Sequence, residues 1–174
     1  MSDSIIPIPE KAKVLVVDDI PENIELLVNI LSNDYDVLTA TRGEQAIRIA
    51  RSDDEPDIIL LDIMMPEMDG YEVCRRLKAD PKTEQIPVVF VTALAESSDE
   101  SYGLSLGAVD FLTKPYVPAV IQIRVRNYLA LYHRNLELNR QIYHHTQEIE
   151  RTRLKIIQRL GRAAEYRDNE TGLH

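Results

Sequence analysis

Three continuous apolar runs, each rich in β-branched residues, constrain the fold of this chain more than any other feature. They are Val14–Val17, Ile58–Leu61 and Val88–Val91. Strands that are buried on both faces of a parallel sheet have this composition, whereas strands with one wet face alternate between apolar and polar residues. A weaker run covers residues 109–112, and the more polar segment 36–40 is typical of an edge strand.

Helical patterns separate these runs. Apolar residues recur at helical spacing after Pro21, Gly43 and Gly70, and a fourth such segment precedes Gly107. The β-α order repeats about five times within roughly 120 residues, and strands that alternate with helices imply right-handed crossovers. We therefore expect a three-layer α/β fold.

Composition excludes several classes of protein. The chain of 174 residues is 44% hydrophobic, which allows a packed core, and its net charge of -9 argues against a non-specific nucleic-acid binder and against docking on anionic lipid. Cys74 is the single cysteine, so no disulfide can form within the chain. Residues 1–10 have neither the basic nor the apolar segment of a secretory signal, so we expect none, and no apolar run is long enough to span a membrane. We expect a soluble, cytoplasmic protein.

A different pattern begins after Pro118, because the segment 119–160 contains neither proline nor glycine. Its apolar residues recur with a 3-4 spacing at Leu131, Leu138, Ile142, Ile149 and Ile156. Two polar residues, His145 and Thr152, occupy positions of the same stripe, and a competing stripe contains Leu129, Leu136, Tyr143 and Ile157. This pattern predicts a weak coiled coil that forms a dimer. The alternative is a long amphipathic helix that packs on its own domain.

Polar residues follow the predicted strands at the points where they end, namely Asp18, Asp19, Asp62, Thr92 and Lys114. Ligands of an open parallel sheet bind at the carboxyl ends of its strands, so these side chains would meet in one cleft. Three carboxylates repel one another unless a cation lies among them, and oxygen ligands without His or Cys favour Mg²⁺ over Zn²⁺. One carboxylate could then act as a nucleophile toward phosphorus, while the lysine and the hydroxyl hold the phosphoryl oxygens.

Four segments of the sequence closely resemble the receiver domain of two-component response regulators. They are Val16–Asp19, Leu60–Gly70, Val91–Ala93 and Phe111–Pro115, and the resemblance covers about residues 12–132. It implies a flavodoxin-like (βα)5 fold, a three-layer sandwich with a parallel sheet of strand order 2-1-3-4-5, followed here by the long C-terminal helix.

The resemblance also implies roles for individual residues. Asp62 would be the phosphoacceptor, phosphorylated by a sensor histidine kinase or a phosphotransfer protein. A cation, Mg²⁺ or Mn²⁺, would be held by Asp19, Asp62, the backbone carbonyl of Met64 and, through water, Asp18. Thr92 and Lys114 would contact the phosphoryl group, and Phe111 would be the aromatic side chain that moves with Thr92. Core packing is the alternative role of Phe111.

The C-terminal segment 160–174 resembles the opening of an HD-GYP output domain, a family that hydrolyses cyclic di-GMP at a metal centre. Glu170 and His174 match its first two metal-ligand positions, but the later histidines and the GYP stretch are absent from the chain. A chance Glu-x-x-x-His in a polar terminus is the alternative. We expect a fragment with a receiver domain at 12–132, a helical coiled-coil linker at 133–160 and an output stub at 161–174.

Two other functions compete with the receiver interpretation. An aspartate-nucleophile phosphohydrolase usually has a second acid two residues after the nucleophile, where this chain has Met64. A receiver-shaped scaffold that never takes phosphate would lack one of the residues Asp19, Asp62, Thr92 and Lys114, and all four are present. We therefore expect a phosphorylation switch that is not itself an enzyme, forms a parallel homodimer through its helix, and belongs to a parent cyclic di-GMP phosphodiesterase.

Overall fold

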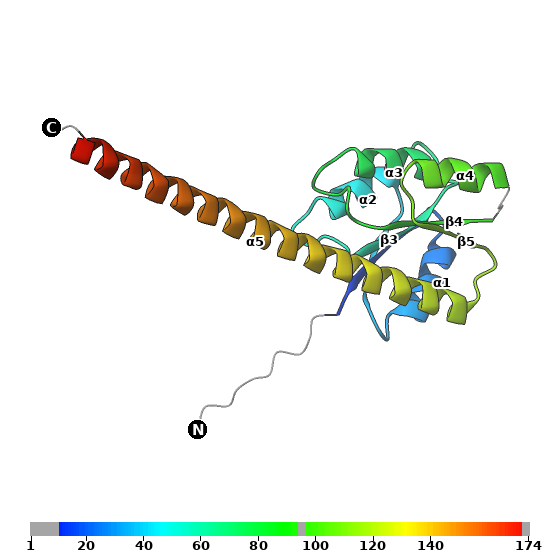
Figure 1. The fold of residues 1–174 in the computed structure, drawn as a ribbon. Coiled ribbons are helices and arrows are strands. Elements are labelled where there is room, and N and C mark those ends of the chain that lie inside the picture. The colour runs from blue at the N-terminus through cyan, green and yellow to red at the C-terminus, as the bar shows by residue number, and fades with distance from the viewer. Residues whose placement is uncertain (1–10, 94–96, 172–174) are drawn as a thin grey trace, which may run out of the picture. The chain divides into compact units, whose positions relative to one another are not determined.

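The computed structural model describes residues 11–93 and 97–171. Strands and helices alternate along this chain (Figure 1). In chain order the elements are β1 (Lys13–Val17), α1 (Pro21–Leu31), β2 (Asp36–Ala40), α2 (Gly43–Ala50), β3 (Ile58–Asp62), α3 (Gly70–Lys78), β4 (Val88–Thr92), α4 (Ser97–Ser105), β5 (Asp110–Thr113) and α5 (Pro118–Thr171). The last strand starts one residue later than the apolar run at 109–112, and Val109 is 38% exposed.

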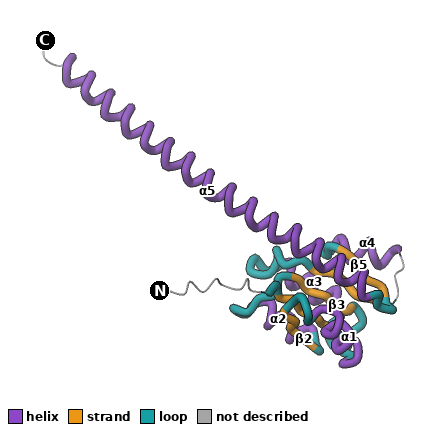
Figure 2. Tube along the Cα trace, turned by 90° about the horizontal axis from the view of Figure 1, so that it is seen from below, coloured by secondary structure: helices purple, strands orange, loops and turns teal. Residues whose placement is uncertain are grey.

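The five strands form one parallel sheet in the order β2-β1-β3-β4-β5, so the fold predicted from the sequence is confirmed. The tube in Figure 2 shows the strands between helices on either side. In the sheet Leu15 lies beside Ile59, and Leu61 lies beside Phe90. The more polar segment 36–40 is an edge strand, and β5 forms the other edge.

Successive residues of each inner strand face two separate hydrophobic cores. Leu15 and Val17 of β1 belong to the core that α2 and α3 cover, while Val14 and Val16 belong to the core covered by α1 and the first turns of α5. Every residue of β3 and β4 is buried. This burial on both faces explains why the strand sequences are continuously apolar.

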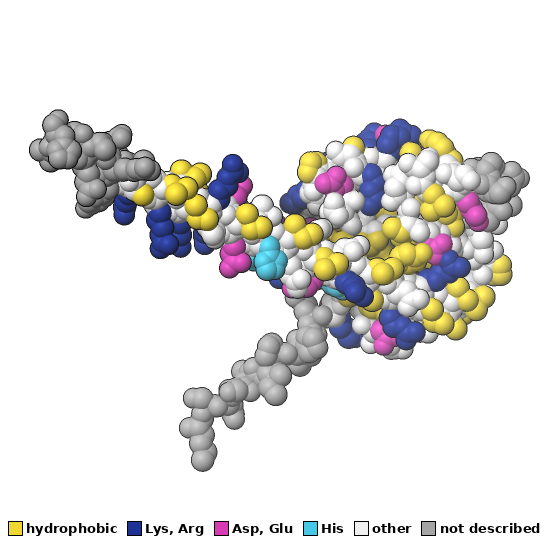
Figure 3. All heavy atoms as spheres, in the orientation of Figure 1, with side chains coloured by type: hydrophobic (Ala, Val, Ile, Leu, Met, Phe, Trp, Pro, Cys, Tyr) yellow, Lys and Arg dark blue, Asp and Glu magenta, His cyan; other side chains and the backbone are white. Residues whose placement is uncertain are grey.

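Helix α5 takes part in two compact units, Met1–Tyr132 and His133–His174. In the first unit its side chains Ile121, Val125 and Leu129 are buried beside α1. In the second unit large apolar side chains are exposed, and Figure 3 shows hydrophobic groups among charged ones on this part of the helix. The helix continues through Gly161 to Thr171. No helix among the described residues has the length and apolar composition that crossing a membrane requires.

The loop between β3 and α3 returns so closely to the strand that only glycine fits at its end. The amide of Gly70 donates to the carbonyl of Ile63 at 2.9 Å, and a Cβ atom at Gly70 would lie 2.3 Å from the carbonyl oxygen of Asp62. Asp69 caps α3 by accepting a hydrogen bond from the amide of Glu72 at 2.8 Å. The first turn of α3 thereby packs directly against the strand end that carries Asp62.

We predict that Gly70→Ala lowers the free energy of unfolding by about 1–3 kcal/mol, because the added methyl group collides with backbone rather than with a mobile side chain. Urea unfolding followed by circular dichroism measures the change. Gly161→Ala is the matched control: a Cβ there meets nothing within 4 Å, and alanine favours a helix interior. Equal unfolding midpoints for Gly70→Ala and the unmodified chain would contradict this packing.

Candidate functional site

Three carboxylates gather where the chain leaves β1 and β3. Oxygen atoms of Asp18, Asp19 and Asp62 all lie within 4.8 Å of one another. Asp18 and Asp62 are buried, with exposed fractions of 1% and 4%. They come together because β1 and β3 are neighbours in the sheet and parallel strands end at the same edge.

Asp18 is held by a ring of hydrogen-bond donors. Its Oδ1 accepts from the amide of Ile20 at 2.9 Å, and both of its carboxylate oxygens accept from the side-chain amide of Asn23, at 3.1 and 3.0 Å. The ammonium group of Lys114 donates to Oδ2 at 3.0 Å. A buried carboxylate with this many partners is fixed in orientation, because each lost hydrogen bond would leave it unsatisfied.

Lys114 connects the far edge of the sheet with the acidic cluster. It follows β5, its amide donates to the carbonyl of Thr92 at 2.8 Å, and the peptide bond to Pro115 is cis. Its Nζ lies 3.0 Å from Asp18 and 3.4 Å from Asp62, with one fifth of the side chain exposed. One ammonium group therefore faces two buried carboxylates, and Asp19 adds a third acid.

This imbalance of charge appears in the pKa of Asp62, which rises to about 6. Burial is the largest cause, since it penalises the ionised carboxylate, and the neighbouring Asp18 raises the pKa further. Lys114 opposes both effects without cancelling them. Asp62 is thus a carboxylate that gains stability from any further positive charge in the cluster.

Asp19 supplies an oxygen that no group among the described residues satisfies. Its Oδ1 atom is buried and has no hydrogen-bond partner among the described residues. An orphaned carboxylate oxygen beside two other carboxylates is suited to a hard divalent cation, because Mg²⁺ and Mn²⁺ prefer oxygen ligands. The residues present therefore fit the cation expected from the sequence.

Thr92 and Phe111 lie at the ends of the neighbouring strands β4 and β5. Thr92 is buried, is the last residue of β4 and stands beside Thr113 in the sheet. The ring of Phe111 is also buried, 5.2 Å between centroids from that of Phe90. A Cβ on Gly103 of α4 would lie 2.4 Å from Phe111. Phe111 is thus a core residue in this structure, packed where α4 has no side chain.

The aromatic contact continues across the helices on this side of the sheet. Tyr71 of α3 meets Phe90 edge-on at 5.3 Å and Tyr102 of α4 at 5.0 Å. Rings at such distances prefer offset and edge-to-face arrangements and pack with little free space. A shift of Phe111 would therefore displace the rings of Phe90 and Tyr71 and, through them, Tyr102. Tyr102 is 47% exposed on the surface of α4.

The remaining residues expected from the sequence lie in the loop after β3, on helix α5 or outside the described part of the chain. Met64 follows β3 in the loop, with 77% of its side chain exposed. The predicted dimer stripe is exposed, with fractions of 45% to 68% at Leu138, Ile142, Ile149 and Ile156. The side chain of Glu170 and the whole of His174 lie outside the described residues.

Two residues of the site were not found from the sequence. Asn23, in the first turn of α1, binds Asp18 with its amide, and Tyr116 has a buried hydroxyl with no hydrogen-bond partner among the described residues. Burial raises the pKa of Tyr116, and the charges of Asp18 and Asp62 add to this effect. A polar residue five positions after Asp18, at the start of a helix, is the one signal that could have indicated Asn23.

Comparison with known proteins agrees with this geometry. The family profile of the response regulator receiver domain matches residues 14–126. The response regulator PleD of Caulobacter vibrioides is 51% identical over 117 residues, which is 67% of this chain and 26% of PleD. A Vibrio cholerae protein named "Probable cyclic di-GMP phosphodiesterase" is 37% identical over 168 residues, which is 92% of this chain and 38% of that protein. The chain thus spans well under half the length of these relatives.

Solved structures show the same fold. The receiver domain of the sensor histidine kinase PA1611 from Pseudomonas aeruginosa, solved with a magnesium ion in its active-site cleft, is 30% identical with a TM-score of 0.64, covering 69% of this chain and 98% of that one. The BeF3-activated receiver domain of RstA from Klebsiella pneumoniae is 36% identical with a TM-score of 0.62, covering 67% of this chain and 97% of that one. The chain belongs to the response regulator receiver family. It is a receiver domain of two-component signalling, and it carries the acidic pocket at which such domains bind Mg²⁺.

The raised pKa of Asp62 predicts how stability depends on pH. The folded chain holds this proton with a pKa of about 6, above the ordinary value of 3.8. Protonation therefore stabilises the fold as the pH falls through about 6 towards 3.8, and ionisation at higher pH destabilises it. We predict that Asp62→Asn raises the free energy of unfolding at pH 8 in EDTA, by at most about 3 kcal/mol, and that this gain shrinks below pH 6.

Urea unfolding at a series of pH values measures this difference. Asp69→Asn, at the exposed cap of α3, is the control, because asparagine also caps helices. If the gain in stability of Asp62→Asn is the same at pH 4.5 and pH 8, ionisation of Asp62 does not destabilise the folded chain and this prediction is wrong.

Proposed function

We propose that Asp62 accepts a phosphoryl group from a partner histidine kinase or phosphotransfer protein, and that this modification switches the receiver surface. The observation that carries the proposal is the position of Asp62, buried at the end of β3 with two further carboxylates and the ammonium group of Lys114 around it. The membership of the chain in the receiver family supports it. In this proposal the chain is a switch rather than an enzyme.

The chemistry is an in-line transfer from nitrogen to oxygen. A carboxylate oxygen of Asp62 attacks the phosphorus of a phosphohistidine, a P–O bond forms as the P–N bond breaks, and the imidazole keeps the electron pair and takes a proton from solvent. Lys114 already reaches both Asp18 and Asp62, so its ammonium group can hold a phosphoryl oxygen with little movement. The hydroxyl of Thr92 is the second group proposed to contact the phosphoryl group.

A divalent cation, Mg²⁺ or Mn²⁺, belongs to the proposed site. Asp19 and Asp62 would bind it directly together with the backbone carbonyl of Met64, and Asp18 would act through water. The orphaned Oδ1 of Asp19 is the observation that supports this ligand set. When bound, the cation balances the negative charge of the carboxylates and of the phosphoryl oxygens.

The switch would pass from the phosphoryl group to the surface of α4 and β5. A bond between the phosphoryl oxygens and Thr92 would pull β4 at its end, and Phe111 would follow into the space that Thr92 vacates. The contacts of Phe111 with Phe90 and with the backbone at Gly103 give this movement a path to α4. Lys114 would join the movement from the end of β5.

The output of the switch is proposed to be cyclic di-GMP hydrolysis by a longer parent protein. The similarity to the Vibrio cholerae protein supports this, because that match covers 92% of the chain and so extends past the receiver. Residues 12–132 would be the receiver, 133–160 a coiled-coil linker and 161–174 the start of an HD-GYP domain with Glu170 and His174 as metal ligands. The linker would form a parallel homodimer through Leu138, Ile142, Ile149 and Ile156.

Phosphorylation tests the central proposal directly. Incubation with acetyl phosphate and Mg²⁺ should add one phosphoryl group to the intact chain, about 80 Da by mass spectrometry. The addition should be absent in Asp62→Asn and in EDTA, because the nucleophile or the cation is then missing. Asp69→Asn, which removes an exposed acid seven residues away, should be phosphorylated normally. Full labelling of Asp62→Asn would rule out Asp62 as the acceptor.

The coupling between Thr92 and Phe111 predicts separable effects. Thr92→Ala should still take up phosphate, at least in part, but should lose the phosphorylation-dependent change in amide hydrogen exchange at α4 and β5. Phe111→Ala should lose the same change. Thr113→Ala is the control, because Thr113 stands beside Thr92 on the outer strand and is exposed. If Thr92→Ala and Phe111→Ala both keep the full exchange response, this coupling is wrong.

A further inference from the structure

We propose that the linker helix pairs with a second copy of this chain in parallel and in register, and that Asn135 and the Glu148–Arg153 pair specify this arrangement. The inference rests on the dimer proposed above and adds which residues decide its orientation and register. Its starting point is the unpartnered apolar stripe of the second unit, where Ile142, Ile149 and Ile156 are 63%, 68% and 52% exposed. Water-exposed isoleucines seven residues apart on one helix are a surface that association would bury.

The spacing of this stripe assigns positions in a heptad abcdefg. Ile142, Ile149 and Ile156 are seven residues apart and occupy position a, while Leu138, His145 and Thr152 precede them by four residues and occupy position d. In parallel coiled coils, β-branched residues at a with leucine at d, as at Leu138, favour two strands over three or four. The competing stripe of Leu129, Leu136, Tyr143 and Ile157 has Glu150 in its seven-residue row, and a charge there disfavours it as the seam.

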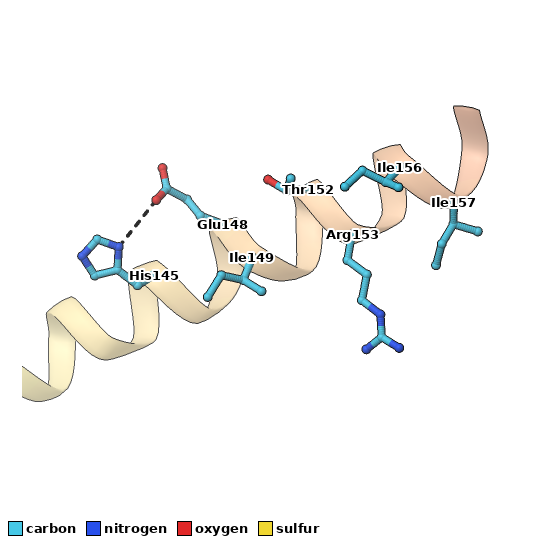
Figure 4. A pocket seen from close by; sticks show the side chains of 7 residues that line it. All are labelled: His145, Glu148, Ile149, Thr152, Arg153, Ile156 and Ile157. Atoms are coloured by element: carbon cyan, nitrogen blue, oxygen red, sulfur yellow. Dashed lines mark ion pairs between the residues drawn. The ribbon is translucent and has the colours of Figure 1, made fainter. Parts of the chain in front are cut away.

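The side chains of this stripe leave a shallow, open groove along the helix. It is lined by His145, Glu148, Ile149, Thr152, Arg153, Ile156 and Ile157 (Figure 4). The lining contains two sets of four residues at positions i, i+3, i+4 and i+7. One set is His145, Glu148, Ile149 and Thr152, and the other is Ile149, Thr152, Arg153 and Ile156. Each set of four is the hole into which a facing helix inserts one side chain in a coiled coil.

Charges on either side of the groove indicate a parallel pair. Glu148 precedes Ile149 at position g, Arg153 follows it at position e, and Figure 4 shows the two side chains pointing to opposite sides of the helix. In a parallel, in-register pair a residue at g faces the residue five positions later on the second copy, which sets each Glu148 against Arg153 of the other chain. In an antiparallel pair g faces g and e faces e, so this complementarity would be lost.

Within its own chain Glu148 has a weak competing partner. The Nδ1 atom of His145 lies 3.7 Å from the carboxylate, both side chains are more than three quarters exposed, and the pair is ionic only when the histidine is protonated. Such an exposed pair contributes little. Glu148 is therefore available to Arg153 of a second copy.

Asn135 sets the register. It is exposed and lies seven residues before Ile142, so it occupies position a one heptad earlier. A single asparagine at a is satisfied when it faces the same asparagine of the second copy. A slip by one heptad would instead place its amide against Ile142, where no hydrogen-bond partner exists.

Disulfide trapping in the full chain tests orientation and register. Native Cys74 does not interfere, because it is buried and its pKa is raised to about 11. In a parallel, in-register pair identical residues face each other at every layer, so Ile142→Cys and Ile156→Cys should each form a covalent dimer in a glutathione redox buffer. An antiparallel pair can bring at most one of these two positions face to face. Arg140→Cys, on the outer face, is the control that should not cross-link.

Charge reversal tests the ion pair by sedimentation equilibrium. Glu148→Arg and Arg153→Glu should each weaken dimerisation about tenfold, because two symmetric attractions become repulsions, and the double swap should restore it. Glu150→Arg makes the same charge change outside the seam and should have no such effect. Failure of the double swap to restore dimerisation would overturn the role of the ion pair.

The outcomes separate this inference from the proposals on which it rests. A chain that stays monomeric at high micromolar concentration, with or without phosphate, would overturn the dimer itself. A dimer that Ile142→Glu with Ile149→Glu dissociates, but in which Ile142→Cys or Ile156→Cys fails to cross-link, would overturn the parallel register alone. Phosphorylation of Asp62 should be unchanged in every linker variant, so its loss in Asp62→Asn remains an independent result.

Discussion

The balance of charge between three carboxylates and one ammonium group is the interaction on which this molecule depends. Asp18 and Asp62 are buried at the ends of adjacent strands, and Lys114 lies close to both. Burial itself raises the pKa of Asp62, and repulsion from Asp18 raises it further. The site is consequently held short of positive charge, which favours the binding of a cation.

The sheet that brings the three carboxylates together also connects them to residues on its other strands. Thr92 and Phe111 lie on β4 and β5, and Lys114 follows β5. These three groups are therefore attached to the two strands whose residues Phe90 and Phe111 lie against Gly103 of α4. Tight aromatic packing from Phe111 through Phe90 to Tyr71 leaves little room for independent motion. Packed interiors shift between discrete arrangements rather than deforming gradually, which is the behaviour that a switch needs.

Helix α5 is buried against the receiver in its first turns and exposes apolar side chains in its later turns. Its first turns contribute Ile121, Val125 and Leu129 to a core of the receiver, and its later turns present isoleucines to water. A helix resists bending because each backbone hydrogen bond spans four residues, so register and rotation are preserved along it better than along a flexible linker. The polar residues His145 and Thr152 at the seam keep the proposed coil marginal, which suits a connection that has to change.

Local patterns were enough to predict a three-layer α/β fold and to nominate the acidic residues, whereas the strand order was predicted from the resemblance to receiver domains. Continuous β-branched runs are typical of strands buried on both faces of a parallel sheet, and the more polar segment 36–40 is typical of an edge strand, which is where it lies. Only the tertiary structure decided which residues contact one another in the site. The contact of Asn23 with Asp18 and the buried hydroxyl of Tyr116 appear only in the folded chain. The steric need for Gly70 comes from the carbonyl of Asp62, and Lys114 meets Asp18 across 96 residues of sequence. The pKa of Asp62 likewise follows from burial and from neighbours on other strands, and distances between such groups exist only once the chain is folded.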